Sequence, residues 1–170
     1  MSTWVTLVTV AVTMAIEARR AARHERAQRE RGGVEPPGDV YPVMQVAYPA
    51  AFLLMSAEGL WRGAPAATWI AGGAAVFAAA KALKWWAILS LGRCWTFRVI
   101  VVPGDRLVQS GPYRYLAHPN YVAVIGELVG VALLTGARVT GPLVTAGFGL
   151  LIAARVAVER RALGAILPRS

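Results

Sequence analysis

Long apolar runs alternate with short polar stretches along the whole chain. Five apolar segments are distinguishable, at residues 2–16, 43–61, 65–91, 119–135 and 140–157. Because a helix of about 20 apolar residues can cross a bilayer, this pattern predicts about five transmembrane helices. Segment 2–16 is short for a span and lacks the basic start and the cleavage site of a secretory signal. We therefore expect a helix that continues into the polar stretch 17–31.

The basic residues favour one side of this pattern. Six arginines lie in 17–42, six lysines and arginines in 81–117, and four arginines in 155–169, whereas only Arg62 and Arg138 fall on the opposite side. This division of 16 to 2 predicts a cytosolic C-terminus and an N-terminus outside. It also requires an odd number of spans, which agrees with five.

The composition agrees with a membrane protein of one domain. The chain has 170 residues, is 56% hydrophobic and has a mean hydropathy of +0.50. The net charge of +9 would suggest nucleic acid in a soluble protein, but these charges lie between apolar runs, so we expect no nucleic-acid partner. Cys94 is the only cysteine, which excludes an intrachain disulfide and argues against a thiolate metal site.

Two polar stretches are expected on the cytosolic side. The first, around "RGGVEPPGDVYP" (31–42), is rich in glycine and proline, which is typical of a linker of turns. The second, 92–117, contains a strand-like run at 97–102 and another at 107–109, separated by Pro103-Gly104. These runs predict a hairpin-like cap on the membrane surface.

The fourth apolar segment begins at a His-Pro corner. Proline is favoured at the first position of a helix, and the residue before proline is kept out of the helical region. We therefore expect a helix from Pro119, with His118 beside the unpaired N–H groups of its first turn, where anions bind. Taken alone, the same two residues are more typical of a plain helix cap.

Two further features accompany this corner. Arg155 and Glu159 are four residues apart, share a helix face and lie level with His118, either as an ordinary surface pair or as part of a site. Glu127 lies about 13 Å along the fourth helix from His118. A carboxylate at that depth is either functional or paired with a basic residue of a neighbouring span. Gly126 and Gly130, at G-x-x-x-G spacing, predict a close approach by another helix.

These motifs resemble the isoprenylcysteine carboxyl methyltransferase family. "SGPYRYLAHPNY" (110–121) and "RVAVERRAL" (155–163) are similar to the family's G-x-Y, R-H-P-x-Y and R-x-x-x-E-E-x-x-L patterns. The resemblance covers about residues 84–163, and the chain looks most like short bacterial members that methylate alkylpyrones and alkylresorcinols. It implies an all-α integral membrane protein with a single methyltransferase domain over 1–170. It also implies a cytosolic cofactor-binding loop, 92–118, between helices three and four, and an active site on the cytosolic side of the bacterial inner membrane.

The resemblance also implies S-adenosylmethionine as the cofactor. The family's cofactor contacts fall on Arg106, Leu107, Val108, Tyr113, His118, Pro119, Asn120, Tyr121 and Glu159, and its substrate-binding arginine falls on Arg155. The chemistry is consistent, since His118 suits a carboxylate, Glu159 suits an ammonium or hydroxyls, and tyrosine faces suit a sulfonium. Three departures stand out: Ala117 before His-Pro, Arg160 in place of the second glutamate, and the short C-terminus "LGAILPRS". The third argues against prenyl-cysteine.

The sequence thus predicts an O-methyltransferase that acts on a carboxylate or acidic enol of a lipid-tailed or prenylated acceptor in the membrane. Arg155 would bind the ionised acceptor, and Glu127 would serve as a general base if the acceptor were a phenol. The alternatives are an alkylresorcinol-type phenol methyltransferase, a non-enzymatic membrane scaffold, or a small transporter, which should show broken helices near the midplane. The sequence leaves the acceptor and the oligomeric state open, and no metal is expected.

Overall fold

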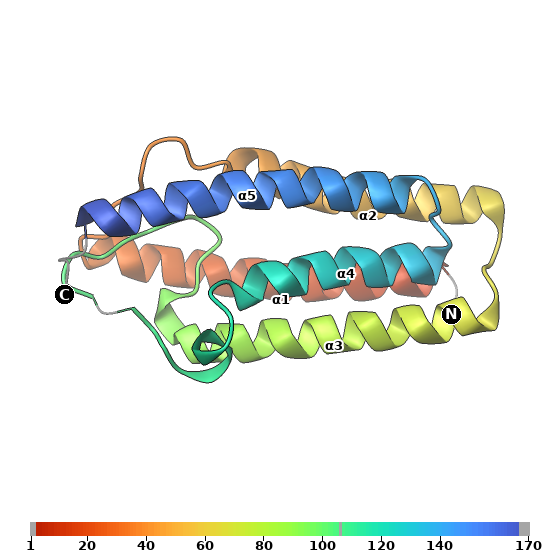
Figure 1. Cartoon of the computed structure of the whole chain (residues 1–170), viewed down its shortest axis with the longest axis horizontal. Coiled ribbons are helices and arrows are strands. Elements are labelled where there is room, and N and C mark those ends of the chain that lie inside the picture. The colour runs from red at the N-terminus through yellow and green to blue at the C-terminus, as the bar shows by residue number, and fades with distance from the viewer. Residues whose placement is uncertain (1–2, 106, 167–170) are drawn as a thin grey trace.

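The computed structural model describes residues 3–105 and 107–166 and is built from long helices (Figure 1). These are α1 (Thr3–Glu30), α2 (Tyr41–Arg62), α3 (Ala67–Leu91), α4 (Pro119–Thr135) and α5 (Thr140–Ile166). Two 3₁₀ turns, η1 (Gly92–Cys94) and η2 (Gly111–Arg114), lie between α3 and α4. The all-helical class and the five helices expected from the sequence are confirmed, and α1 does continue through the polar stretch after residue 16.

The helices lie along one common direction, and both polar stretches are at the same end of the bundle (Figure 1). We call this the loop end: α1, α3 and α5 finish there, and α2 and α4 begin there. The α2–α3 and α4–α5 connections, with Arg62 and Arg138, are at the opposite end. Apart from Lys81 and Lys84, which lie farther along α3, the described basic residues fall into the two groups that the sequence predicts.

Helix α4 is the centre of the bundle and contacts all four other helices. Its closest neighbour is α3, because glycines leave room for the α3 backbone. A Cβ added at Gly130 would lie 2.8 Å from the Phe77 nitrogen, and one added at Gly126 would lie 2.9 Å from the Ala80 Cβ. The predicted close helix approach is confirmed, and α3 is the helix that makes it.

Three of the described helices are long and apolar enough to cross a membrane: α2, α3 with the turn that follows it, and α5. Helix α4 is apolar but has 17 residues, or about 25 Å. Large apolar side chains cover the outside of the bundle, among them Leu53, Trp61, Trp69, Leu143 and Leu150. The long apolar helices and the apolar exterior are those of a membrane protein. The full count of five spans stays a prediction.

The loop between α3 and α4 is anchored at the loop end, in a way that the sequence did not indicate. Trp95 is buried against Ala21 of α1 and Ile88 of α3. The expected hairpin is wrong: among the described residues there is no strand. Instead, Val101 forms one antiparallel bridge with Val34, with N–O distances of 2.9 and 3.0 Å. The stretch 31–42 is therefore attached to the loop rather than being a free linker.

Candidate functional site

A cavity of about 640 Å³ extends from the loop end into the bundle. All five helices and the loop between α3 and α4 contribute to its wall. The inner part is largely apolar and is formed by Met14, Met44, Val124 and Phe148, among others, whereas the part nearest the loop end carries His118, Arg155 and Glu159. Ligand pockets commonly combine an apolar wall with a few convergent polar groups in this way.

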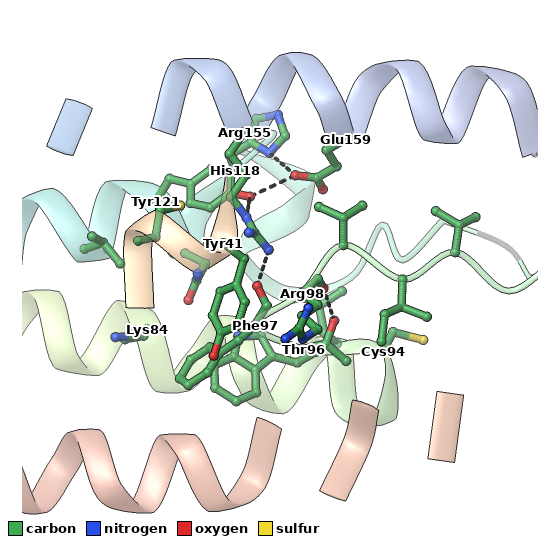
Figure 2. A pocket seen from close by; sticks show the side chains of 18 of the residues that line it. Tyr41, Lys84, Cys94, Thr96, Phe97, Arg98, His118, Tyr121, Arg155 and Glu159 are labelled. Atoms are coloured by element: carbon green, nitrogen blue, oxygen red, sulfur yellow. Dashed lines mark hydrogen bonds and ion pairs between the residues drawn. The ribbon is translucent and has the colours of Figure 1, made fainter. Parts of the chain in front are cut away.

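The polar residues predicted from the two sequence motifs come together in this cavity (Figure 2). The His118 and Tyr121 rings stack with centroids 5.4 Å apart, and His118 Nδ1 is 3.8 Å from Glu159 Oε2. The Tyr121 hydroxyl donates to Glu159 Oε2 at 3.0 Å and accepts from Arg155 Nε at 2.9 Å. One end of the cavity therefore holds a chain of an imidazole, a carboxylate, a phenol and a guanidinium.

The start of α4 presents polar groups to the same cavity. Pro119 is the first helical residue, and His118 precedes it without any side-chain bond that caps the helix. Tyr121 N and Val122 N both donate to the His118 carbonyl, at 3.1 and 3.3 Å. The N–H of Asn120 is in the first turn of α4, where no helical carbonyl precedes it to accept a hydrogen bond. Its side-chain Oδ1 is buried and has no hydrogen-bond partner among the described residues. A donor and an acceptor are thus available to a ligand here.

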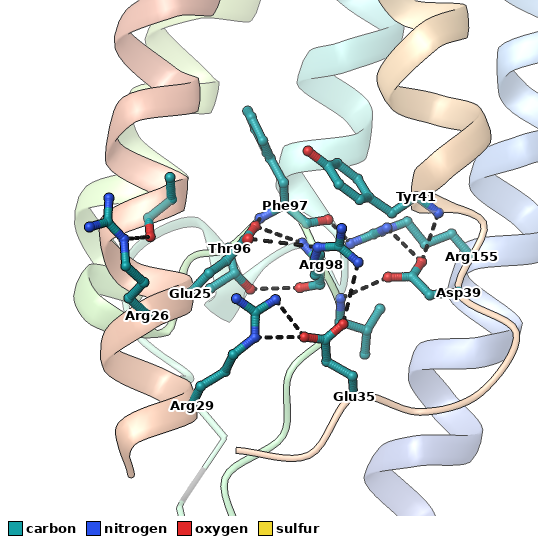
Figure 3. Close-up of polar contacts among 12 residues, drawn as sticks. Glu25, Arg26, Arg29, Glu35, Asp39, Tyr41, Thr96, Phe97, Arg98 and Arg155 are labelled. Carbon is teal, nitrogen blue, oxygen red and sulfur yellow. Dashed lines mark hydrogen bonds and ion pairs between the residues drawn. The ribbon is translucent and has the colours of Figure 1, made fainter. Parts of the chain in front are cut away.

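Arg155 is buried and connects three parts of the chain (Figure 3). Besides Tyr121, its guanidinium donates to Asp39 Oδ1 at 2.9 Å and to the Phe97 carbonyl. Asp39 in turn accepts from Tyr41 N at 3.0 Å and from Val99 N at 3.1 Å. Three of the five guanidinium N–H groups are therefore engaged, which leaves two for a ligand.

Sequence reasoning missed Asp39. The glycine- and proline-rich stretch 31–42 resembles a linker, and Arg155 is 116 residues away. The one available signal was an acid two residues before Tyr41-Pro42, where a carboxylate can accept a helix-start N–H. The structure makes Asp39 the fixed partner of the arginine that the motif singles out.

Helix α1 holds the same loop from its other side. Glu25 accepts from Phe97 N at 3.1 Å and from Arg98 N at 3.2 Å (Figure 3). Glu35 pairs with Arg29 at 2.6 Å and with Arg98 at 3.4 Å. Segment 96–99 is consequently a fixed roof over the cavity, attached to α1, to the start of α2 and to α5.

The remaining residues carried over from the family are mostly in the cavity wall. Those that line it are Leu107, Val108, Tyr113, His118, Asn120, Tyr121, Arg155 and Glu159. Pro119 starts α4 without lining the cavity, and Arg106 lies outside the described residues. Burial and then the nearby Glu159 charge raise the pKa of Tyr113, so this phenol stays neutral. Gly111 allows its turn to pack on α3, because an added Cβ would lie 2.0 Å from Ser90 Oγ.

Glu127 belongs to a second polar group, deeper in the bundle, that we call the deep cluster: Glu17, Tyr48, Lys81, Lys84 and Glu127. Glu127 is 1% exposed, accepts from the Tyr48 hydroxyl at 2.5 Å, and lies 3.0 Å from Lys81 Nζ and 3.2 Å from Lys84 Nζ. The same lysines reach Glu17 at 2.8 and 2.7 Å. The sequence left open whether Glu127 is functional or is paired with a basic residue of a neighbouring span. These contacts show the pairing, with two lysines of α3.

Comparison with known proteins identifies the family to which the chain belongs. The chain belongs to the isoprenylcysteine carboxyl methyltransferase (ICMT) family, whose model matches residues 73–165. It is 33% identical over 160 residues to the uncharacterized protein YpbQ of Bacillus subtilis, covering 94% of this chain and 95% of the relative. It is 25% identical over 149 residues to an uncharacterized protein of Haemophilus influenzae, covering 87% of each. No solved structure matches the chain significantly.

Family membership and the apolar helices together define a membrane protein of a methyltransferase family. The family match covers most of α3, the loop, α4 and α5. Helices α1 and α2, which supply Glu17 and Tyr48, lie outside it, and so does the stretch between them, which supplies Asp39. The relatives' names state no substrate.

Proposed function

We propose that the chain is an S-adenosylmethionine-dependent O-methyltransferase that acts on a carboxylate or acidic enol of a lipid-tailed acceptor. The observation that carries this proposal is the single cavity that joins the His118–Glu159 polar group to an apolar interior among membrane helices. A polar cofactor would reach the first part from the loop end. A hydrocarbon tail would fit the second.

The residues at the loop end match the functional groups of S-adenosylmethionine, which when bound supplies an electrophilic methyl group. His118 and the Asn120 N–H suit its carboxylate at the start of α4. The unpaired Asn120 Oδ1 and the Glu159 carboxylate suit its ammonium or its ribose hydroxyls. The faces of Tyr113 and Tyr121 suit the sulfonium cation.

The acceptor site follows from the inner part of the cavity. Met14, Met44, Val124 and Phe148 would surround the hydrocarbon tail. The two N–H groups of Arg155 that have no partner among the described residues would hold an ionised acceptor oxygen. Once ionised, such an oxygen is a nucleophile, so alignment with the methyl group and exclusion of water would supply much of the catalysis. The roof segment 96–99 would contribute the exclusion.

A neutral phenol acceptor is the second candidate, and one observation favours it. A phenol must lose its proton, and the cavity wall contains Tyr48, whose hydroxyl donates to the Glu127 carboxylate. A transporter is less consistent with the molecule, because over the described residues each long helix is continuous, without matched breaks near the midplane.

The orientation in the membrane is also part of the proposal. Most of the described basic residues are at the loop end, and only Arg62 and Arg138 are at the opposite end. The loop end would therefore face the cytosol, where S-adenosylmethionine is made, and the membrane would be the bacterial inner membrane.

An acceptor screen tests this function. The full chain, purified in detergent, would be incubated with S-adenosylmethionine labelled in its methyl group. The acceptors would be a long-chain fatty acid, an alkyl hydroxypyrone, an alkylresorcinol and a prenyl-cysteine. We expect label in the organic phase with at least one acidic lipid acceptor. Cofactor binding without transfer to any acceptor would contradict the proposed reaction, and absence of cofactor binding would contradict the whole assignment.

A further inference from the structure

The cavity ends at the deep cluster. Tyr48, Lys84 and Glu17 form the polar part of its inner wall, beside the apolar residues, and the Tyr48 hydroxyl donates to Glu127. Tyr48 is seven residues beyond Tyr41, which places it about 10 Å below the roof along α2. In the proposed function, the tail of the acceptor would fill the apolar part of the cavity, and its polar head would lie between Arg155 and Tyr48.

The deep cluster is costly if its only role is to hold helices together. It places two carboxylates and two ammonium groups in the interior of a membrane bundle, each less than 13% exposed at its side chain. Apolar residues of similar volume often replace such buried ion pairs with no loss of stability. Ionisable groups at this depth are functional candidates by default. One of them, Glu127, accepts a hydrogen bond from Tyr48, a residue that lines the cavity, and this contact points to a role in proton transfer.

A methyl acceptor that reaches the site from the bilayer must give up its proton there. A lipid acid or enol dissolved among hydrocarbon chains is far more stable protonated than ionised, because an isolated charge is strongly disfavoured there. An acceptor that comes from the bilayer therefore brings its proton with it, even when the same group would be ionised in water. Methyl transfer to that oxygen requires the proton to leave inside the cavity.

We propose that Tyr48 and Glu127 form a proton relay for the acceptor, an inference that rests on the proposed function. The acceptor O–H bond breaks and its proton binds the Tyr48 hydroxyl oxygen, while the Tyr48 proton passes across the 2.5 Å hydrogen bond to Glu127 Oε2. The acceptor oxygen forms a bond to the methyl carbon of S-adenosylmethionine, and the bond between that carbon and the sulfur breaks. The products are the methylated acceptor, S-adenosylhomocysteine and a protonated Glu127.

The charges in the cavity favour this route. Lys81 and Lys84 of α3 and Glu17 of α1 surround the Tyr48–Glu127 pair. Helix α5 contributes the Phe148 ring, 5.1 Å from the Tyr48 ring. The four ionic groups sum to zero. Protonation of Glu127 makes the group +1 as the sulfonium loses its positive charge, so the total buried charge does not change during the reaction.

The decisive variant is Tyr48→Phe. It removes one hydroxyl and keeps the ring that packs on Phe52 and Phe148, with centroids at 4.8 and 5.1 Å. Tyr115→Phe is the matched control, because Tyr115 is 75% exposed and does not line the cavity. Both variants and the wild type would be compared in kcat/KM, from pH 6 to 10, with an alkylresorcinol, an alkyl hydroxypyrone and a long-chain fatty acid.

We expect Tyr48→Phe to lower kcat/KM by about 10²-fold with the alkylresorcinol, whose proton is held most tightly. The loss should shrink with the more acidic acceptors and should shrink as the pH rises towards the acceptor's own pKa. Glu127→Gln should show the same dependence on acceptor and on pH. A loss of equal size for all acceptors at all pH values would indicate damaged packing and overturn the relay. So would full activity of Tyr48→Phe on the alkylresorcinol.

A binding measurement without cofactor gives an independent test. A long-chain alkyl nitrophenol bound to the protein reports its ionisation by its absorbance. We expect a substantial ionised fraction in the wild type and in Tyr115→Phe, and a much smaller one in Tyr48→Phe. Equal fractions in all three proteins would overturn the relay while leaving the proposed methyltransferase intact. A wild type that methylates none of the acceptors would contradict the proposed function and the relay with it.

Discussion

Replacement of Arg155 by lysine tests whether a planar guanidinium is needed to hold the site together. Arg155 donates separately to Tyr121, Asp39 and the Phe97 carbonyl. A lysine ammonium is a compact charge on a single atom and can keep one of these partners, most readily Asp39. Two hydrogen bonds that involve a charged group are then lost, each worth about 1.5–3 kcal/mol. Water in the cavity recovers part of this, so we expect a net cost of about 2–4 kcal/mol.

This cost is divided between the stability of the roof and ligand binding. If about half of it reaches the ligands, kcat/KM for the acceptor falls by roughly 5- to 30-fold, since each 1.4 kcal/mol is a factor of ten. The assay is steady-state methyl transfer, with S-adenosylmethionine affinity measured by calorimetry. Arg161→Lys is the control, because Arg161 is exposed on the same helix and does not line the cavity. Unchanged kinetics and affinity in Arg155→Lys would refute the role given to the guanidinium.

Three further predictions concern the bundle. Reporter fusions at Arg62 and at Arg138 should both give a non-cytosolic signal, and a cytosolic signal at either position would contradict the predicted topology. Gly130→Leu should lower the thermal unfolding midpoint, because even a Cβ there meets the Phe77 backbone at 2.8–2.9 Å. Overpacking of this kind typically costs about 1–3 kcal/mol. An unchanged midpoint would show that α3 and α4 are not packed as described. Glu58→Ala should also lower this midpoint, because the Glu58 carboxylate accepts hydrogen bonds from the N–H groups at the start of α5. The variant should keep its affinity for S-adenosylmethionine, since Glu58 lies at the end of the bundle opposite the site. A loss of affinity would contradict that separation.

Local chemistry accounts for what the sequence predicted well. Pro119 sets the start of α4 because its fixed φ and missing N–H suit the first helical position, and the glycines at 126 and 130 set the face that α3 approaches. The i, i+4 spacing of Arg155 and Glu159 places both on one face of α5. These rules act within one or two helical turns, and for that reason they can be applied without knowledge of the fold.

Contacts between distant segments were not predictable in the same way. The bond between Asp39 and Arg155 and the bridge between Val34 and Val101 depend on how the loop end folds over the bundle, and no local pattern encodes that arrangement. The partners of Glu127 illustrate the same limit. The sequence indicated that a basic residue from another helix could pair with it, whereas the choice of both lysines of α3 follows from the way α3 packs against α4.

The central claim is that the group around His118 and Glu159 binds S-adenosylmethionine, and direct binding to the purified full chain tests it. Calorimetry would compare the wild type with His118→Ala, with Glu159→Ala and with Glu30→Ala, whose side chain is exposed on α1 away from the cavity. We expect saturable binding in the wild type and in Glu30→Ala, and no measurable binding in the two site variants, with unchanged helical circular dichroism in all four proteins. Wild-type affinity in either His118→Ala or Glu159→Ala would contradict the account of the site.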